Sequence, residues 1–244
     1  MVITSKSNPT IKEISKLNDK KYRKISGLYI VDGIKPVKEC IRAGCEIQFI
    51  VCIERFENEF NNPIVVSESV FESLSTEKTP QGALAVVKIP NFKLKSPENS
   101  CILLDCLQDP GNLGTIIRTA NAAGYSEIYL INCTDPYSPK AVRASMSGIF
   151  FVKIYTGTRE EILSVLGGVP IVCADMDGND IFNFTPPDKY CLCIGNEGGG
   201  IADELLDLAE YKIRIPMQSS CESLNAAVSA GIAMYQLKYG LKRL

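Results

Sequence analysis

Residues 215–237 read IPMQSSCESLNAAVSAGIAMYQL, a polar loop that runs directly into a long apolar helix. The helix, expected over 225–241, has apolar residues at helical spacing and therefore one buried face. That face consists of Leu224, Val228, Ile232 and Tyr235. Polar side chains at the start of a buried helix need hydrogen-bond partners or a ligand. The stretch is therefore either a capped core helix, with Ser223 or Asn225 as the cap, or a reaction centre.

Composition limits the class of protein. A chain of 244 residues with 45% hydrophobic content is enough for one large or two modest domains. It has no basic-then-apolar signal and no apolar run of the roughly 20 residues that cross a membrane, so we expect a cytoplasmic protein. Ten cysteines without a signal are typical of a reducing compartment. Because histidine and CxxC spacings are absent, we expect no metal site and no imidazole base.

The net charge of −2 hides an uneven distribution. Residues 1–42 contain ten Lys and Arg against four Asp and Glu, whereas residues 100–244 are acidic. A basic arm on an acidic protein is compatible with a surface that binds RNA phosphates or with an ordinary solvated helix face. The candidate RNA-binding residues of this arm are Lys12, Lys16, Lys20, Lys21, Arg23 and Lys24.

The first 95 residues are expected to form a small α/β domain with its linker. Asn8 followed by Pro9 predicts a helix that ends near Leu17, and the basic residues follow on it and on the next turn. Short apolar runs alternate with helical patterns after that. The expected strands are 28–31, 47–53, 64–66 and 84–87, and the expected helices are 36–43 and 68–74.

Residues 96–244 are expected to form a second α/β domain. Its strands and helices alternate, which predicts a parallel sheet covered on both faces. The expected strands are 101–104, 128–131, 150–155, 170–174, 191–194 and 212–215. Ligands of such sheets bind at the carboxyl ends of the strands, and three unusual loops lie at those positions.

The first of these loops, DPGNLG at 109–114, leads into the helix TIIRTANAAG. Asn112 stands at the helix start, and Arg118 points away from the apolar stripe of the helix. Taken alone, Asn112 is equally well explained as a helix cap, and Arg118 as a surface charge. The second loop, IGNEGGG at 194–200, lacks the spacing of a phosphate-binding loop. Its glycines favour close approach of the backbone to a flat ligand, with Glu197 at the reacting end.

The three loops in this order resemble the three motifs of the SpoU, or TrmH-like, RNA methyltransferases of the SPOUT superfamily. Residues 1 to about 90, with SKSNPTIKEISKL and GLYIVDGIKPVKECIRAG, resemble the L30e-like RNA-binding domain that often precedes that catalytic domain. The resemblance covers essentially the whole chain. It implies a SPOUT-type sheet domain whose C-terminal segment is threaded into a trefoil knot.

The resemblance also implies an activity, a cofactor and partners. The activity is methyl transfer from S-adenosylmethionine to a ribose 2′-hydroxyl of RNA, and the protein is expected to be a homodimer through its catalytic domain. The cofactor contacts are Gly195, Ile215, Met217 and Leu224. The reaction site is Asn112, Arg118, Glu197, Ser223 and Asn225. Ser219 and Ala227 depart from the family pattern, which commonly has Gly and Ser there.

The protonation and hydrogen-bonding properties of these side chains predict a different role for each. A guanidinium is effectively always protonated, so we expect Arg118 to bind phosphate and stabilise a developing alkoxide. Glu197 is the better proton acceptor or orienting group. Asn112, Ser223 and Asn225 supply neutral hydrogen bonds. By analogy with the family, ribosomal RNA of the large subunit is the expected substrate, with transfer RNA as the alternative.

Two other functions compete with ribose methylation. Cys221 is a nucleophile candidate for a pyrimidine-carbon methyltransferase, but no basic residue adjoins it in sequence to activate the thiol. The second is a non-catalytic RNA-binding protein built on the N-terminal domain. It predicts RNA binding without cofactor binding.

Overall fold

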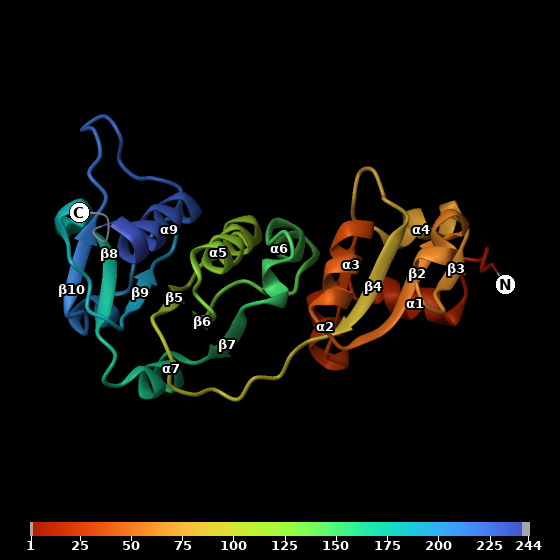
Figure 1. Cartoon of the computed structure of the whole chain (residues 1–244), viewed down its shortest axis with the longest axis horizontal. Coiled ribbons are helices and arrows are strands. Elements are labelled where there is room, and N and C mark those ends of the chain that lie inside the picture. Colours follow the sequence, from red (N-terminus) through yellow and green to blue (C-terminus); the bar gives the residue numbers. More distant parts are fainter. Residues whose placement is uncertain (1, 241–244) are drawn as a thin grey trace. The chain divides into compact units, whose positions relative to one another are not determined.

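The computed structural model describes residues 2–240, which form two compact units (Figure 1). Unit 1 consists of Met1–Asn91 together with Asp135–Phe150, and unit 2 of Phe92–Thr134 with Phe151–Leu244. The expected division at residue 95 did not assign the segment 135–150 to the first unit. The last residue of the helix expected over 225–241 lies outside the described residues.

Unit 1 has a mixed four-stranded sheet in the order β1-β4-β2-β3. The pairs β1–β4 and β2–β4 are antiparallel, and β2–β3 is parallel. The strands are β1 (Leu28–Asp32), β2 (Ile47–Ile53), β3 (Ile64–Val66) and β4 (Ala83–Lys88). The α-helices are α1 (Pro9–Lys16), α2 (Lys20–Ser26), α3 (Ile34–Arg42), α4 (Glu68–Leu74) and α6 (Pro139–Ala144). Two 3₁₀ turns, η1 (Glu54–Glu59) and η2 (Gly148–Phe150), complete the unit.

The core of unit 1 lies between the sheet and helices α1 and α4. Ile11 and Ile14 of α1 and Phe71 of α4 are buried in one cluster with sheet residues such as Val51 and Leu84. Helix α1 begins as predicted, because Oδ1 of Asn8 accepts a hydrogen bond from Thr10 N at 2.9 Å. Apolar burial of this kind is the main term that stabilises a small domain.

The basic residues after α1 form a second helix, so the predicted turn was wrong. Asp19 caps α2 by accepting a hydrogen bond from Lys21 N at 2.8 Å, and Gly27 ends it with φ of 68°. Glycine adopts this left-handed conformation without steric cost. The helix has seven residues and one buried side chain, Arg23, so its sequence has little apolar periodicity.

Arg23 holds the segment 135–150 against the rest of unit 1. Its Nη2 lies 2.7 Å from Oδ2 of Asp135, and its Nη1 donates to Leu17 O at 2.8 Å. Tyr29 and Tyr137 pack with ring centroids 5.0 Å apart. The side chain of Arg23 is only 4% exposed. Arg23 therefore lies in the interior instead of on the expected RNA-contacting surface.

Unit 2 has a six-stranded sheet in the order β10-β8-β9-β5-β6-β7, and every pair is parallel, which confirms the prediction. The strands are β5 (Cys101–Asp105), β6 (Glu127–Ile131), β7 (Lys153–Gly157), β8 (Ile171–Asp180), β9 (Cys191–Ile194) and β10 (Tyr211–Arg214). The helices are α5 (Pro110–Ala123), α7 (Arg159–Leu166), α8 (Asp203–Asp207) and α9 (Ala226–Tyr235), with a 3₁₀ turn η3 (Ile181–Asn183) and a final π-helical turn η4 (Gln236–Gly240).

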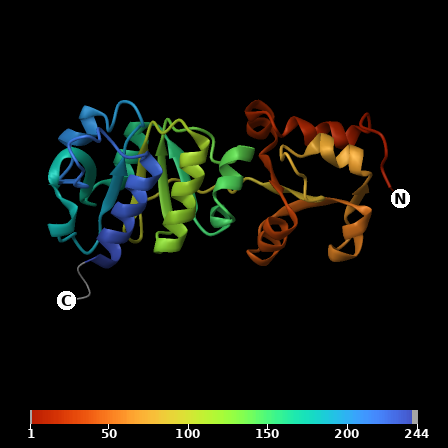
Figure 2. The same ribbon diagram turned by 90° about the horizontal axis from the view of Figure 1, so that it is seen from above.

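Both faces of this sheet are covered. Helices α7 and α8 contribute Ile162 and Leu205 to a core with Leu103, Tyr129 and Cys193 of the sheet. Helices α5 and α9 lie side by side on the other face (Figure 2). The chain reverses direction across the sheet between β5 and β9, which makes the carboxyl ends of these two strands a topological switch point. The threading of the C-terminal segment stays a prediction.

The expected buried face of the last helix was wrong. Val228 is 50% and Tyr235 46% exposed. The buried residues of α9 are Ala226, Ala227, Ala230, Ala233 and Met234. Small side chains let two helices approach closely, and α9, which contacts α5, buries four alanines and Met234 while Val228 and Tyr235 stay exposed.

Candidate active site

The first loop of the site is fixed by a helix cap. Oδ1 of Asp109 accepts a hydrogen bond from Asn112 N at 2.9 Å, and Pro110 occupies the first position of α5. Asp109, rather than Asn112, is therefore the N-cap. This leaves the side-chain amide of Asn112 available for other contacts at the carboxyl end of β5.

Asn112 uses both ends of its amide to join the other two loops. Its Nδ2 donates to Oε1 of Glu197 at 2.9 Å, and its Oδ1 accepts from Nδ2 of Asn225 at 2.9 Å. Asn225 in turn caps α9, because its Oδ1 accepts from Ala227 N at 3.0 Å and from Val228 N at 3.3 Å. We call Glu197, Asn112 and Asn225 the relay. It connects segments that are 85 and 113 residues apart in sequence.

The backbone of the first loop also holds Glu197. Gln108 N donates to Oε2 at 3.4 Å, and Asp109 N donates to Oε1 at 3.3 Å. Partial desolvation raises the pKa of Glu197, but the hydrogen bonds from Asn112 and from the backbone outweigh it and lower the pKa below its ordinary value. Glu197 is therefore an ionised and firmly oriented carboxylate near neutral pH.

Asn196 is a positioning residue that the sequence interpretation missed. Its Nδ2 donates to Cys106 O at 2.7 Å, and its Oδ1 accepts from Gly198 N at 2.7 Å and from Gly199 N at 3.1 Å. It thereby ties the Gly-rich loop to the end of β5. An Asn two residues before a run of glycines is typical of a side chain that caps its own turn, and this signal is present in the sequence.

Gly195 is required by the loop itself. A Cβ atom at this position would lie 2.2 Å from the carbonyl carbon of Gly200 and 2.4 Å from Ile201 N. No side chain fits there, so the close backbone approach that the glycines predicted is to the protein's own chain. Its contact with a cofactor stays a prediction.

Two adjoining cavities lie beside the third loop. The first, of about 120 Å³, is lined by three of the expected cofactor contacts, Ile215, Met217 and Leu224, and by Ser223. The second, of about 180 Å³, shares Ile215 and Met217 with it. Apolar walls with a few polar groups are typical of small-molecule sites. Asp175 and Ser229 supply such groups in the first cavity, so the residues present fit an adenosine moiety.

Arg118 stands apart from the relay. It is exposed on α5, six residues after Asn112, and six residues of an α-helix turn the side chain well away from the starting direction. Within residues 2–240 its guanidinium forms no hydrogen bond or ion pair. Ser223 is exposed as well, and its carbonyl oxygen accepts from Sγ of Cys221 at 3.4 Å.

Among the described residues, no helix combines the length and the apolar character of a membrane span. The same part of the chain also contains no group of three or more Cys, Asp or Glu side chains arranged to hold a metal ion.

Comparisons with known proteins identify both parts of the chain. Residues 99–235 match the model of the SpoU rRNA Methylase family, and residues 8–85 match the MRM3-like substrate binding domain. The chain is 30% identical to a 23S rRNA (guanosine(2553)-2'-O)-methyltransferase of Bacillus subtilis (strain 168), over 97% of this chain and 98% of the relative.

Solved structures agree with the sequence matches. A crystal structure of an AdoMet-bound rRNA methyltransferase from Sinorhizobium meliloti has a TM-score of 0.90 at 29% identity, over 99% of this chain and 98% of that one. The SpoU methyltransferase AviRb of Streptomyces viridochromogenes, in complex with the cofactor AdoMet, has a TM-score of 0.85 at 26% identity, over 94% of this chain and 97% of that one.

Proposed function

Because this chain belongs to the SpoU rRNA methylase family, we propose that it transfers a methyl group from S-adenosylmethionine to a ribose 2′-hydroxyl of 23S ribosomal RNA. The observation that supports this most is the relay, which places a carboxylate and two amides at the switch point of the parallel sheet. The relatives from Bacillus subtilis and Sinorhizobium meliloti match this chain almost end to end, and their names refer to rRNA.

The cofactor, when bound, supplies an electrophilic methyl group on a sulfonium. Ile215, Met217 and Leu224 would hold it through apolar contacts in the cavity of the third loop. Asp175, in the same lining, is a candidate partner for ribose hydroxyls, since a carboxylate often binds them. Ser223 lies at the edge of this cavity and would orient the polar end of the cofactor.

Glu197 would orient the reacting hydroxyl. Its carboxylate is held by Asn112 and two backbone N–H groups, and it remains partly open to solvent, so it can accept a hydrogen bond from the ribose 2′-hydroxyl. Its lowered pKa makes it a weak base. We therefore assign it to alignment of the hydroxyl more than to removal of the proton.

Arg118 would bind the phosphate next to the methylated ribose. A guanidinium without an internal partner among the described residues is free for an external anion, and its planar donors match phosphate. The same positive charge would stabilise an alkoxide as the hydroxyl proton leaves.

Unit 1 would supply the RNA-binding surface. Lys12, Lys20, Lys21 and Lys24 are exposed, whereas Lys16 is paired with Glu13 at 2.6 Å. Exposed lysines gathered on neighbouring helices provide phosphate contacts that do not depend on base sequence. Homodimer formation would involve the apolar residues that α9 and η4 leave exposed, Val228, Tyr235 and Tyr239. The ten free cysteines favour a cytoplasmic location.

The test is to map 2′-O-methylation in RNA from cells with and without the gene. Methylated riboses resist alkaline cleavage, so loss of one resistant bond in 23S rRNA after deletion supports the proposal. Loss of a bond in transfer RNA would favour the alternative substrate. Calorimetry with S-adenosylmethionine addresses the non-catalytic alternative, which requires that no cofactor binds.

A further inference from the structure

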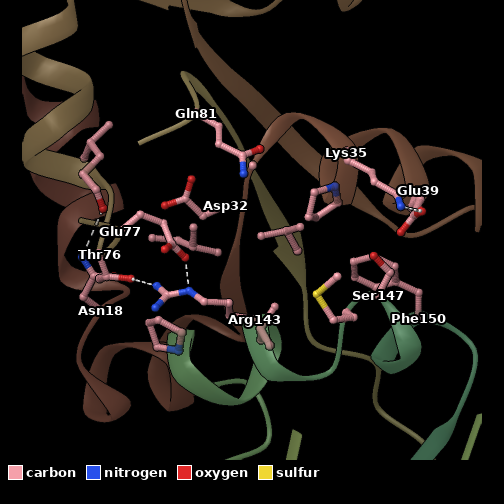
Figure 3. A pocket seen from close by; sticks show the side chains of 18 residues that line it. Asn18, Asp32, Lys35, Glu39, Thr76, Glu77, Gln81, Arg143, Ser147 and Phe150 are labelled. Carbon is pink, nitrogen blue, oxygen red and sulfur yellow. Dashed lines mark hydrogen bonds and ion pairs between the residues drawn. The ribbon is translucent and has the colours of Figure 1, made fainter. Parts of the chain in front are cut away.

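Unit 1 contains a cavity of about 300 Å³ that the methyl-transfer site does not include (Figure 3). Its lining comes from β1, the start of α3, the end of α4 and the segment 135–150, all within unit 1. The volume lies at the lower end of the range for pockets that bind small molecules or single bases.

Asp32 at the end of β1 is the unusual residue of this cavity. Its Oδ2 accepts a hydrogen bond from Ser75 Oγ at 2.5 Å, whereas its Oδ1 is shielded from solvent and has no hydrogen-bond partner within residues 2–240. Desolvation raises the pKa of Asp32, and this effect exceeds the opposing effects of the Ser75 hydrogen bond, the charge of Arg143 and the backbone N–H groups of Gly33 and Thr76. A buried polar atom without a partner calls for an explanation, and a ligand that donates hydrogen bonds is one.

The other two acidic residues of the lining are already paired. Glu39 lies 3.9 Å from Nζ of Lys35, and Glu77 pairs with Arg143 (Figure 3). Arg143 also donates to Oγ1 of Thr76 at 2.9 Å. Asp32 is thus the acidic group of the lining that forms no ion pair with the described residues.

The remaining wall is suited to a flat ring. Apolar side chains line the cavity, including Pro36, Val142, Met146 and Phe150. Aromatic and thioether side chains pack well on the faces of bases. Met146 and Ser147 have positive φ values of 44° and 69°, which is uncommon outside glycine. Such strained residues cluster at binding sites, and here both line the cavity.

The cavity also adjoins the basic helix. Asn18, which lines it, directly precedes the cap of α2, and the exposed Lys20 and Lys21 begin that helix. An RNA strand whose phosphates contact these lysines would have a nucleotide within reach of the cavity. Proteins read RNA sequence mainly from unpaired bases that are turned out of the helix.

We propose that this cavity binds an unpaired guanine of the RNA substrate, with the Asp32 carboxylate on its Watson–Crick edge. The inference rests on the proposed function, because it names a recognition element of the same substrate. Guanine presents two adjacent donors, N1–H and N2–H₂, which match the two oxygens of a carboxylate. Adenine, cytosine and uracil each have a single donor group on that edge, next to an acceptor, so none of them offers a carboxylate two adjacent donors.

Filter binding of large-subunit rRNA from gene-deleted cells tests the proposal. Gln81→Trp places a bulky ring at the exposed rim of the cavity, and Asp32→Asn removes the carboxylate. Each should raise the Kd for RNA by about tenfold or more, since a hydrogen bond to a charged group is worth about 1.5–3 kcal/mol. Gln48→Trp, on the exposed side of β2, is the matched control and should leave the Kd unchanged.

Titration of the full chain with nucleoside monophosphates tests the choice of base. Guanosine 5′-monophosphate should perturb the NMR signals of the cavity residues, and adenosine, cytidine and uridine 5′-monophosphates should not. The Gln81→Trp variant should lose the response. Binding of free guanosine monophosphate with an unchanged RNA Kd in both variants would indicate a nucleotide effector and overturn the RNA assignment.

The outcomes separate this inference from the proposed function. If both variants bind RNA as the wild type does, the inference is wrong whether or not methylation occurs. If the variants lose RNA affinity while the wild type methylates no ribose, the cavity assignment holds and the proposed function fails. Thermal unfolding of the Gln81→Trp variant shows whether any loss reflects misfolding instead.

Discussion

Nδ2 of Asn112 donates a hydrogen bond of 2.9 Å to Oε1 of Glu197, across 85 residues of sequence. Asn112 lies on α5, which follows β5, and Glu197 lies in the loop that follows β9; these neighbouring parallel strands flank the point where the sheet reverses its order. The contact fixes the direction of a carboxylate that also accepts two backbone hydrogen bonds. Orientation of this kind reduces the entropy lost when a hydroxyl is aligned with a methyl donor.

Asn112→Ala should reduce the rate of methyl transfer. The substitution removes both the hydrogen bond to Glu197 and the hydrogen bond from Asn225. Because loss of a hydrogen bond to a charged group is costly, we expect the rate of methyl transfer to fall roughly tenfold to hundredfold. Single-turnover methylation assays measure this rate. Thr115→Ala, one turn further on the same helix and outside the relay, is the control and should retain its rate. Equal rates in both variants would exclude a role for the relay.

Glu197→Gln should lower the rate and change its pH dependence. Because the pKa of Glu197 is lowered in the folded protein, the wild type keeps the ionised carboxylate down to acidic pH and loses it only below the ordinary range of carboxyl groups. Glutamine would place an N–H₂ group against three N–H donors. A pH–rate profile in which the variant kept the wild-type rate and ascending limb would contradict the assignment.

The lowered pKa of Glu197 also makes the stability of the protein depend on pH. A carboxyl group with a depressed folded pKa stabilises the protein above its unfolded pKa, and that contribution disappears as the pH falls through the folded value. The wild type should therefore lose more stability between neutral and acidic pH than Glu197→Gln does. Thermal melts at a series of pH values measure the difference, and parallel curves would count against the lowered pKa.

Arg118→Ala should reduce methylation strongly without changing folding. The side chain is exposed and has no internal partner in residues 2–240, so the melting temperature and cofactor affinity should match the wild type. Arg118→Lys should recover only part of the activity, because lysine lacks the planar fork that binds phosphate. Full activity of Arg118→Ala on rRNA would remove this residue from the site.

Arg23 and Lys21 should separate stability from RNA binding. Arg23→Ala breaks a buried ion pair with Asp135 and should cost about 3 kcal/mol of unfolding free energy. Lys21→Ala should leave stability unchanged and weaken RNA binding, with a salt dependence smaller by roughly 0.7 in the logarithmic slope. Denaturant melts and salt-dependent filter binding measure the two effects. The reverse pattern would show that the two residues had been assigned wrongly.

Much of the fold could be predicted from the sequence, because its local signals are strong. The strands Ile47–Ile53, Ile64–Val66 and Cys191–Ile194 and the helix Glu68–Leu74 have the predicted bounds. Their apolar runs and polar ends specify these elements with little help from the rest of the chain. The alternation of strands and helices also sufficed to predict that the three loops share one sheet edge.

What was missed depends on long-range packing. Helix α2 has a cap but little apolar periodicity, and its place depends on contacts of Arg23 that include Asp135, 112 residues away. The buried face of α9 was assigned to Leu224, Val228, Ile232 and Tyr235, yet the buried residues of this helix are four alanines and Met234. These long-range contacts of Arg23 and α9 leave no local pattern in the sequence. Asn112 is a different case, because Asp109 followed by Pro110 has the same cap signal as Asn8 followed by Pro9, and Asp109 takes the cap position and frees the Asn112 amide.

The most direct test of the account is methyl transfer by the purified protein. Isotopically labelled S-adenosylmethionine would be incubated with 23S rRNA from gene-deleted cells and either wild-type protein or the Asn112→Ala variant. The account predicts that the wild type places label in one alkali-resistant dinucleotide, on the ribose, and that the variant labels it far more slowly. Label on a base, or none in rRNA under conditions where the cofactor binds, would contradict it.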